Sequence, residues 1–384
     1  MRNNIEERSS AVNMDELILL YDRYRGGDRD LLPRLRELCL SLPNFSHPSS
    51  PVGDPSKTRL LRLNGSPKPT DYPPKNAVAL LSNEILSNPR ARRRLRGLGL
   101  LRCHNMVPGC GHRSYNFYGS LALLETALVT FVLDRVIGTG MQQISVPDIL
   151  PASAIESCGF PTSGERTQTF TIDDSTAGSR RFCLSGTAEM GIASYCAGRI
   201  FGPKSPAEYF CAVSRCYRRE VPNQESLLYR THQFTKVEMF CVSEPTMKAS
   251  EDAFDKILNL QQSIFADLGL HYRVLEMPTS ELGNPAFRKV DIEAFMPGDG
   301  SFGEISSTSS CTDYQARRLN IKWCSPEAFA FTLNGTGCAV TRVIKALVET
   351  HQRKDGTVGL PQALWPYMNN AKELEPDESQ VVFS

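Results

Sequence analysis

The chain has 384 residues, with 43 Lys and Arg against 42 Asp and Glu, so its formal net charge is +1. A hydrophobic content of 41% excludes global disorder and supplies a core for one large domain or two of moderate size. The charge balance indicates neither DNA nor a membrane surface, and the longest apolar stretch, residues 121–137, is too short and too charged to span a bilayer. The 12 cysteines, in a large chain that begins without an apolar leader, favour reduced thiols inside a cell.

Two short helices are predicted first. Asn13 or Asp15 is placed to cap the first helix, a Gly-Gly pair breaks the pattern, and residues 31–42 carry leucines on one face. Residues 43–74 are rich in Pro, Ser, Asn and Gly, which predicts a linker or an extended arm that lies on another domain. A cluster of six arginines follows.

The rest of the chain alternates β-type runs with helices. Helices are predicted at residues 120–137, 251–268 and 340–352. The main β-type runs cover residues 210–220, 229–242 and 328–337. Strands that dominate the middle, with helices between them, predict an antiparallel α+β domain rather than a doubly wound one. The sequence contains no GxxxxGK[ST] phosphate loop and no internal repeat.

Residues 212–242 are predicted as a hairpin with the connection VPNQES. Arg218 and Glu220 are two apart, so we expect them on one face of the first strand. The second strand carries a mixed charged and aromatic face formed by Arg230, His232, Phe234, Lys236 and Glu238. A solvated face crossed by salt bridges is one interpretation. We favour the other, a groove for a polyanionic and planar ligand, because an aromatic ring lies among the charges.

Three further segments carry polar groups. In TLNGTGCAVTR, Gly335 and Gly337 alternate with short polar residues, so a ligand or another strand can approach the backbone there, although tight packing also explains the pattern. The helix that follows has Arg342 in its first turn. In FGEISSTSSCTDYQARR, Glu304 precedes hydroxyl groups that suit a hard cation, although such runs are more often turns. LSGTAEM adds Thr187 at the start of a helix.

These segments occur in the order TAE, RRE…HQFTKVE, EISS and TLNGTG…R, and in this the chain resembles the seryl-tRNA synthetases of class II. Two more runs resemble the animal mitochondrial form, LSLPNFSHPSSPVGD and MPTSELGNPAFRKVDIEAFMPG. The resemblance implies an α+β fold in which an antiparallel sheet is flanked by helices, with a short helical N-terminal stub. The implied domains are a remnant of the helical tRNA-binding arm at 1–42, a linker and basic segment at 43–110, a catalytic domain at 111–372 and an acidic tail at 373–384.

The same resemblance implies the activity. ATP activates serine to seryl-adenylate with Mg²⁺ present, and the seryl group passes to mitochondrial tRNA(Ser) in the mitochondrial matrix, although the stretch after Met1 is too acidic for a presequence. The implied assembly is a homodimer, with no membrane or DNA partner. The alternative is a non-ligating paralogue that acts as a tRNA-binding or regulatory subunit, paired as a heterodimer with a true synthetase.

Residue roles carry over from the family motifs. Arg218 and Arg342 are the implied catalytic residues, and Glu304 with Ser307 the implied Mg²⁺ ligands. ATP contacts are implied for Arg218, Arg219, Glu220, Arg230, Thr231, Phe234, Glu304, Ile305, Ser306, Ser307 and Arg342. Serine contacts are implied for Thr187, Ala188, Glu189, Arg218, Glu238, Asn334 and Thr336. We further hypothesise that the arginine cluster contacts tRNA phosphates rather than forming a solvated helix face, through Arg90, Arg92, Arg93, Arg94 and Arg96.

Three features depart from the family. Only the first and last turns of its long coiled-coil arm are recognisable, the VPNQES loop is short and is followed by Leu227 at a customary glycine, and Phe331 stands where histidine is frequent. The first two departures fall on parts that face tRNA. A cluster of possible metal ligands matches no zinc spacing, so we interpret it as structural or free groups. Its members are Cys103, His104, Cys110 and His112.

Overall fold

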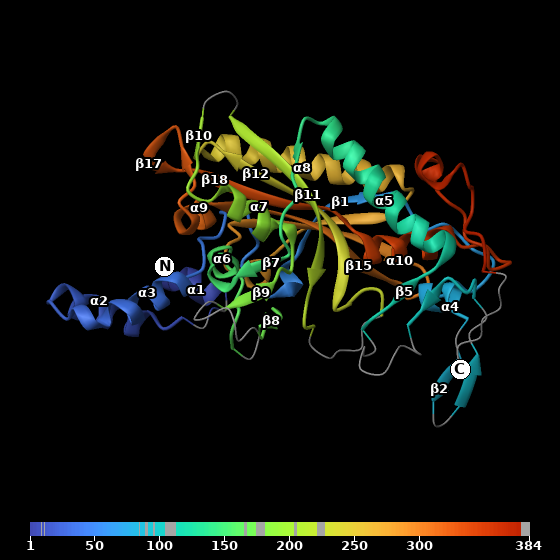
Figure 1. Ribbon diagram of the computed structural model, residues 1–384, viewed down its shortest axis with the longest axis horizontal. Helices are drawn as coiled ribbons and strands as arrows, with labels where there is room; N and C mark the ends of the chain where they lie inside the picture. Colours follow the sequence, from blue (N-terminus) through green and yellow to red (C-terminus); the bar gives the residue numbers. More distant parts are fainter. Residues whose placement is uncertain are drawn as a thin grey trace.

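One eight-stranded sheet runs through the molecule (Figure 1). Its neighbouring strands pair antiparallel except at one edge, where β6 lies parallel to β11. In spatial order the strands are β1 (Arg59–Asn64), β13 (Tyr272–Glu276), β14 (Arg288–Met296), β15 (Ser301–Thr312), β18 (Phe331–Ala339), β12 (Gln233–Ser243), β11 (Ala207–Tyr217) and β6 (Gln142–Gln143). The predicted α+β class, an antiparallel sheet flanked by helices, is confirmed.

The computed structural model describes most of the chain. It describes residues 1–377 except 9, 11, 84, 89–90, 95–96, 104–112, 165–166, 174–180, 203–205 and 221–226, and no side chains at 84–96 or 326. The helices are α1 (Arg2–Glu7), α2 (Met14–Arg25), α3 (Leu32–Ser41), α4 (Ala77–Leu81), α5 (Gly119–Gly138), α6 (Ala152–Ser157), α7 (Ala188–Cys196), α8 (Met247–Asp267), α9 (Tyr314–Leu319) and α10 (Val340–His351). None of the described helices is long and apolar enough to cross a membrane.

Three long helices, α5, α8 and α10, pack on the sheet and share its main hydrophobic core. A Cβ added at Gly335 would collide with Ile257 of α8, and one at Gly337 would approach Val132 of α5 to 3.1 Å. The glycines in β18 therefore let helices, not a ligand, approach the strand, which corrects one of our two interpretations. The helices α7 and α9 pack on the other face of the sheet, opposite α5, α8 and α10. There they form a second hydrophobic cluster with the strands.

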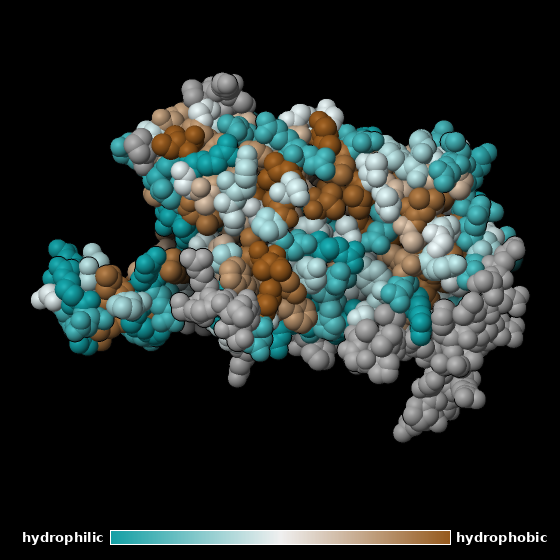
Figure 2. Space-filling view, in the orientation of Figure 1, coloured by the Kyte–Doolittle hydropathy of each residue, from teal (hydrophilic) through white to brown (hydrophobic). Residues whose placement is uncertain are grey.

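The N-terminal residues form a short helical stub (Figure 1). Of the two predicted caps, Asn13 and Asp15, it is Asn13 that caps α2, because its side chain accepts hydrogen bonds from two backbone N–H groups. The helices α2 and α3 pair side by side, linked by an ion pair of 2.8 Å between Arg34 and Glu16. Figure 2 shows this pair projecting from the body with a largely hydrophilic surface. Only α3 buries leucines, Leu35 and Leu38, at its base.

The segment predicted as a linker also builds the sheet. Residues 59–64 form β1, which pairs antiparallel with β13 and adds an edge strand that the composition of this segment did not predict. The Arg59 guanidinium donates to the backbone carbonyl of Ser49 (2.9 Å) and to the carboxylate of Glu276 in β13 (2.5 Å). These two bonds fasten the extended chain before β1 to the sheet. This part of the segment is therefore a strand of the sheet itself, which neither the linker nor the arm interpretation predicted.

Other boundaries differ from the predictions for local reasons. The helix predicted from residue 251 begins at Met247, because the Thr246 hydroxyl accepts a hydrogen bond from the N–H of Ala249 and caps it. The β-type run 328–337 is divided at Ala330 between β17 and β18, because the Ala330 N–H bonds to Ile321 outside the main sheet. The smaller strands are β2 (Ile85–Asn88), β3 (Ala91–Arg94), β4 (Leu101–Arg102), β5 (Asn116–Phe117), β7 (Ile149–Pro151), β8 (Thr171–Ile172), β9 (Phe182–Leu184), β10 (Ile200–Phe201), β16 (Lys322–Trp323) and β17 (Ser325–Phe329).

Candidate active site

The β11–β12 hairpin brings the first group of predicted residues together, but not by strand alternation. β11 ends at Tyr217, and Glu220 has φ +45°, so the expectation that Arg218 and Glu220 share a strand face is wrong. Instead, two contacts hold the segment after β11 against the segment before β12. The Arg218 N–H donates to the His232 carbonyl (2.9 Å), and a ring nitrogen of His232 lies 3.0 Å from the Arg218 carbonyl. Glu220 is buried and pairs with Arg230 at 3.1 Å.

Beside this turn lies an aromatic platform. Phe234 is buried, packs with Cys216 and Ala339, and has the Arg218 guanidinium carbon 5.2 Å from its ring centre. The hydroxyl of Thr231 is buried with no hydrogen-bond partner in the part of the chain that the structure describes. Arg219 is exposed, with its N–H bonded to the Gln168 carbonyl.

A second arginine of the site, Arg342, is buried just after the end of β18. Arg342, in the first turn of α10, is only 7% exposed and pairs with Glu304 at 3.0 Å. It also donates to the carbonyls of Tyr229 and Glu304, both at 3.2 Å, and lies over the Tyr229 ring. These contacts fix the guanidinium in one orientation before any ligand is present.

The carboxylate of Glu304 lies among further charges. Burial alone would raise the pKa of Glu304, but attraction to Arg342, and then to Lys289 and Arg218, outweighs burial and lowers it. In the neighbouring strand Lys289 pairs with Asp291 at 2.7 Å. Burial first, and repulsion by Glu304 as well, raise the pKa of Asp291, while Lys289 opposes them. Glu304 is therefore anionic at neutral pH.

A β-bulge decides which side chains accompany Glu304. Ile292 pairs with Ser306 and the next residue of β14 pairs with Glu304, so Ile305 is an extra residue in β15. Glu304 and Ser307, three apart, therefore share a face that regular alternation would deny them. A carboxylate and a hydroxyl side by side fit a hard cation that keeps several waters and phosphate oxygens. The side chain of Ile305 lies in the core, and the Ser306 hydroxyl donates to a backbone carbonyl, so neither side chain points to this site.

The second group of predicted residues forms a compact anionic pocket. Glu238 Oε2 accepts from Thr187 (3.2 Å) and Thr336 (3.3 Å) and pairs with Lys236 at 2.5 Å. Glu189 Oε1 accepts from Asn334 (2.8 Å), and also from Gln315 (2.7 Å). All of these residues except Thr187 and Glu189, which begin α7, come from the sheet or from α9. Ala188, at the start of α7, is buried.

In each of these carboxylates one oxygen has no hydrogen-bond partner among the described residues. No hydrogen bond within the described part of the chain reaches Oε2 of Glu189 or Oε1 of Glu238. Burial raises the pKa of the Glu189 carboxyl to about 7, and repulsion by Glu238 adds to this, while Gln315, Lys236 and Arg218 act in the opposite direction. The pocket is thus a site that gains from a bound cation with several hydrogen-bond donors.

Arg218 connects the two groups. Its guanidinium lies over the Phe234 ring of the platform, and its charge attracts carboxylates of both groups, which lowers the pKa of Glu189 and of Glu304. Its one described side-chain hydrogen bond, to the Gly186 carbonyl, is long at 3.4 Å. A guanidinium with one long hydrogen bond among the described residues keeps donors for a ligand that carries several negative charges.

Several site residues had no signal in the sequence analysis. Gln315 reaches Glu189 from α9 and also accepts from Thr332 (2.8 Å), although it lies in a run that we read only for its hydroxyl groups. Lys289 and Asp291 join Glu304 only because β14 and β15 are neighbours. Asp291 Oδ1 is buried with no partner among the described residues. Pairing across strands, which the sequence does not display, supplies these contacts.

Some predictions lie outside the described residues. These are the VPNQES loop, Arg90 and Arg96, the side chains of Arg92, Arg93 and Arg94, and the pair His104 and His112 with Cys110. Cys103 is described and is buried. Within the described chain, no three His, Cys, Asp or Glu side chains are grouped as metal ligands.

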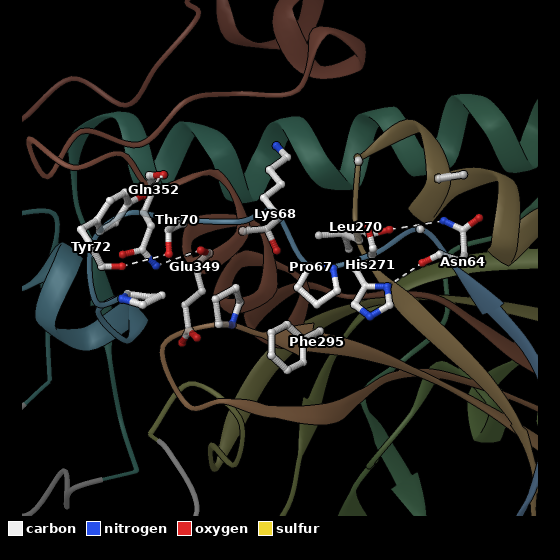
Figure 3. Close-up of a pocket in the computed structure, with 17 residues that line it drawn as sticks. Asn64, Pro67, Lys68, Thr70, Tyr72, Leu270, His271, Phe295, Glu349 and Gln352 are labelled. Atoms are coloured by element: carbon white, nitrogen blue, oxygen red, sulfur yellow. Dashed lines mark hydrogen bonds between the residues drawn. The ribbon is translucent and has the colours of Figure 1, made fainter.

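A cavity of about 230 Å³ lies elsewhere, between the linker and the ends of α8 and α10 (Figure 3). Its polar groups bond to one another: the Tyr72 hydroxyl donates to the Gln352 carbonyl (2.7 Å), and His271 lies 2.7 Å from the Asn64 carbonyl. Prolines and Phe295 form much of the remaining wall. The described lining of this cavity holds none of the residues that the sequence analysis assigned to the site.

The fold and this site together define a class II aminoacyl-tRNA synthetase. The model of the tRNA synthetase class II core domain (G, H, P, S and T) matches residues 170–351. The mitochondrial serine–tRNA ligase of Mus musculus is 39% identical over 355 residues, which are 91% of this chain and 65% of the relative. The serine–tRNA ligase of Rubrobacter xylanophilus is 36% identical over 348 residues, 88% of this chain and 77% of the relative.

A solved structure gives the same result. The seryl-tRNA synthetase from Pyrococcus horikoshii, complexed with ATP, is 29% identical with a TM-score of 0.81, over 97% of this chain and 86% of that chain. The chain belongs to the serine–tRNA ligase family. It spans 65% of the length of its mouse mitochondrial relative.

Proposed function

We propose that this chain activates serine with ATP and transfers the seryl group to tRNA. One observation carries the proposal: the Arg218 guanidinium lies over the Phe234 ring and donates to the Gly186 carbonyl beside Thr187, so it adjoins both the aromatic platform and the anionic pocket. Serine has an ammonium group for the carboxylates and a carboxylate for the guanidinium. ATP has the phosphates that Arg218 and Arg342 can bind.

In the first step a serine carboxylate oxygen attacks the α-phosphorus of ATP, the bond to the bridging oxygen breaks, and pyrophosphate leaves with the electron pair. Arg218 holds the carboxylate and the α-phosphate together and stabilises the charge that develops there. Arg342 binds the terminal phosphates. No general base is required, because the serine carboxylate is already ionised at neutral pH.

The adenine end of ATP belongs on the aromatic platform. Phe234 stacks on the base, Glu220 accepts from the adenine amino group, and the buried hydroxyl of Thr231 gains a partner. Glu304 and Ser307 are the residues that would hold Mg²⁺, which neutralises phosphate charge when bound. Lys289 and Arg342 keep the Glu304 carboxylate ionised for this purpose.

Serine is selected by its hydroxyl as well as its ammonium group. Glu189 and Glu238 bind the ammonium group, while Thr336 and Asn334 line the side where the hydroxyl lies. A buried site built to hydrogen-bond a hydroxyl discriminates against alanine, because alanine would leave these groups unpaired. Glycine is rejected for the same reason.

We assign the transfer step to a serine tRNA, because the relatives are serine–tRNA ligases. We place it in mitochondria because the 39% identical relative is named a mitochondrial enzyme, and within mitochondria we propose the matrix. The chain acts as a homodimer, and its arginine cluster contacts tRNA phosphates. We do not favour the non-ligating alternative, in which the chain pairs as a heterodimer with a true synthetase, because a chain that binds no substrate has no need of buried charges such as Glu189, Glu238 and Lys236, which are costly to keep.

The test is serine-dependent exchange of pyrophosphate into ATP, followed by charging of mitochondrial serine tRNA. We expect exchange with serine but not with alanine or glycine. Absence of exchange in the folded protein would refute activation. Exchange without charging of any serine tRNA would refute the transfer step alone.

A further inference from the structure

The N-terminal stub meets the body of the molecule at α1 (Figure 1), and Arg8, which follows α1, fastens the two together. Arg8 is 6% exposed, and no carboxylate of the described chain forms an ion pair with it. Burial lowers the pKa of its guanidinium to about 10. Its five acceptors are the carbonyls of Asn44, Phe45, Leu282, Gly283 and Ala286, at 2.6 to 3.4 Å. A buried cation with only carbonyl partners is tolerated when all of them are in place, so Arg8 locks these segments together.

Asn44, which accepts from Arg8 through its carbonyl, continues the connection with its side chain. Its amide nitrogen lies 2.8 Å from the Cys311 carbonyl, 3.0 Å from the Thr312 hydroxyl and 2.9 Å from the Pro285 carbonyl. Asn44 is 5% exposed. The N-terminal half of the chain thereby holds the last two residues of β15.

Those two residues have an unusual backbone. Thr312 has φ +44°, a conformation that a β-branched residue adopts only under constraint, and the pairing of β15 with β18 is irregular between Ser310 and Thr312. The irregularity brings the Cys311 sulfur to 3.7 Å from the amide nitrogen of Asn334. Asn44 contacts both residues of this bend, so it supports the strained conformation.

Asn334 links this bend to the proposed serine pocket, because its side-chain amide nitrogen also donates a hydrogen bond to Glu189 at 2.8 Å. We propose that Arg8 and Asn44 are positioning residues for serine: by holding the Cys311–Thr312 bend they set the orientation of Asn334 and, through it, of Glu189. The proposal rests on the proposed function. It assigns to the N-terminal segment a role in amino acid binding that is separate from contact with tRNA.

The proposal separates the two substrates. The described contacts of the ATP side, around Arg342 and Glu304, involve neither Arg8 nor Asn44. Loss of the bend should therefore weaken serine binding while ATP binding remains. A merely structural role for these residues would instead lower stability, or weaken both substrates together.

The experiment compares Asn44→Ala and Arg8→Met with the wild-type chain, using Arg59→Met as a matched control that removes another anchor of the same half of the chain. Serine and ATP binding are each measured by calorimetry, and KM for each by pyrophosphate exchange. We expect serine to bind about tenfold more weakly to both variants, with ATP within about twofold of wild type and no serine effect of Arg59→Met. Arg8→Lys, which keeps the charge, should recover part of the loss.

A double-mutant cycle tests the bend itself. Glycine adopts positive φ without strain, so Thr312→Gly should make Asn44 less necessary. We expect Asn44→Ala to weaken serine about tenfold alone but less than about threefold in the Thr312→Gly background. Equal losses in both backgrounds, or equal losses for serine and ATP, would overturn the proposal. If the wild-type chain binds no serine, both the proposed function and the positioning role of Arg8 and Asn44 are refuted. If the wild-type chain binds serine and the variants bind it equally well, only the positioning role is refuted.

Discussion

Glu189 is the residue whose substitution tests the serine pocket most directly. Burial, and then repulsion by Glu238, raise its pKa from 4.5 to about 7. A carboxyl whose pKa is higher in the folded protein than in the unfolded chain favours folding when protonated, so this stability is present below pH 4.5 and is lost as the pH rises through about 7. Glu189→Gln keeps an oxygen that can accept from Asn334 and Gln315 but removes the charge.

The size of the effect follows from the two pKa values. Ionisation of Glu189 costs about 3 kcal/mol of folding free energy at pH 8 and about 1.4 kcal/mol at pH 5.5. The advantage of Glu189→Gln over wild type should therefore be larger at pH 8 by about 2 kcal/mol. The same substitution should raise KM for serine about tenfold to a hundredfold at pH 8, because one of two carboxylates facing the ammonium group loses its charge.

The assay is urea unfolding of both proteins without ligands at pH 5.5 and pH 8, with pyrophosphate exchange at pH 8. Glu327→Gln, at an exposed position, is the control for loss of a carboxylate and should show no pH-dependent gain. A stability difference between Glu189→Gln and wild type that is the same at both pH values would refute the electrostatic reasoning. An unchanged KM for serine would refute the assignment of Glu189 to the ammonium group.

Three further predictions concern other parts of the molecule. Arg218→Ala should lower exchange at least a hundredfold, with Arg218→Lys intermediate, and near-wild-type exchange would remove its role. Gly335→Ala should destabilise the protein by about 1–3 kcal/mol in urea because a helix side chain fills the space, whereas Gly138→Ala, where nothing lies within 4 Å, should be close to neutral. Reversing the charges of Arg92 and Arg94 should weaken tRNA binding and make its salt dependence shallower by about two counterions, and an unchanged slope would contradict the phosphate contact.

Local rules explain what the sequence predicted well. The hairpin strands, the long helices and the Asn13 cap depend on spacing and on neighbours within a few residues. The same rules misplaced Arg218 and Glu220, because β11 ends one residue before the pair and Glu220 has positive φ. They also missed β1, because an edge strand with exposed side chains has no alternation of buried and exposed positions to reveal it.

The sequence by itself determined the α+β class, the order of the motifs and most side chains of the site, since these depend on residue type and local spacing. Only the tertiary structure decided how they meet. The bulge at Ile305 brings Glu304 and Ser307 to one face, Gln315 reaches Glu189 from α9, and Arg8 lies next to a loop 274 residues or more away in the chain. Such contacts depend on strand pairing, register and burial, which join segments far apart in the sequence and leave no periodic signal in any one of them.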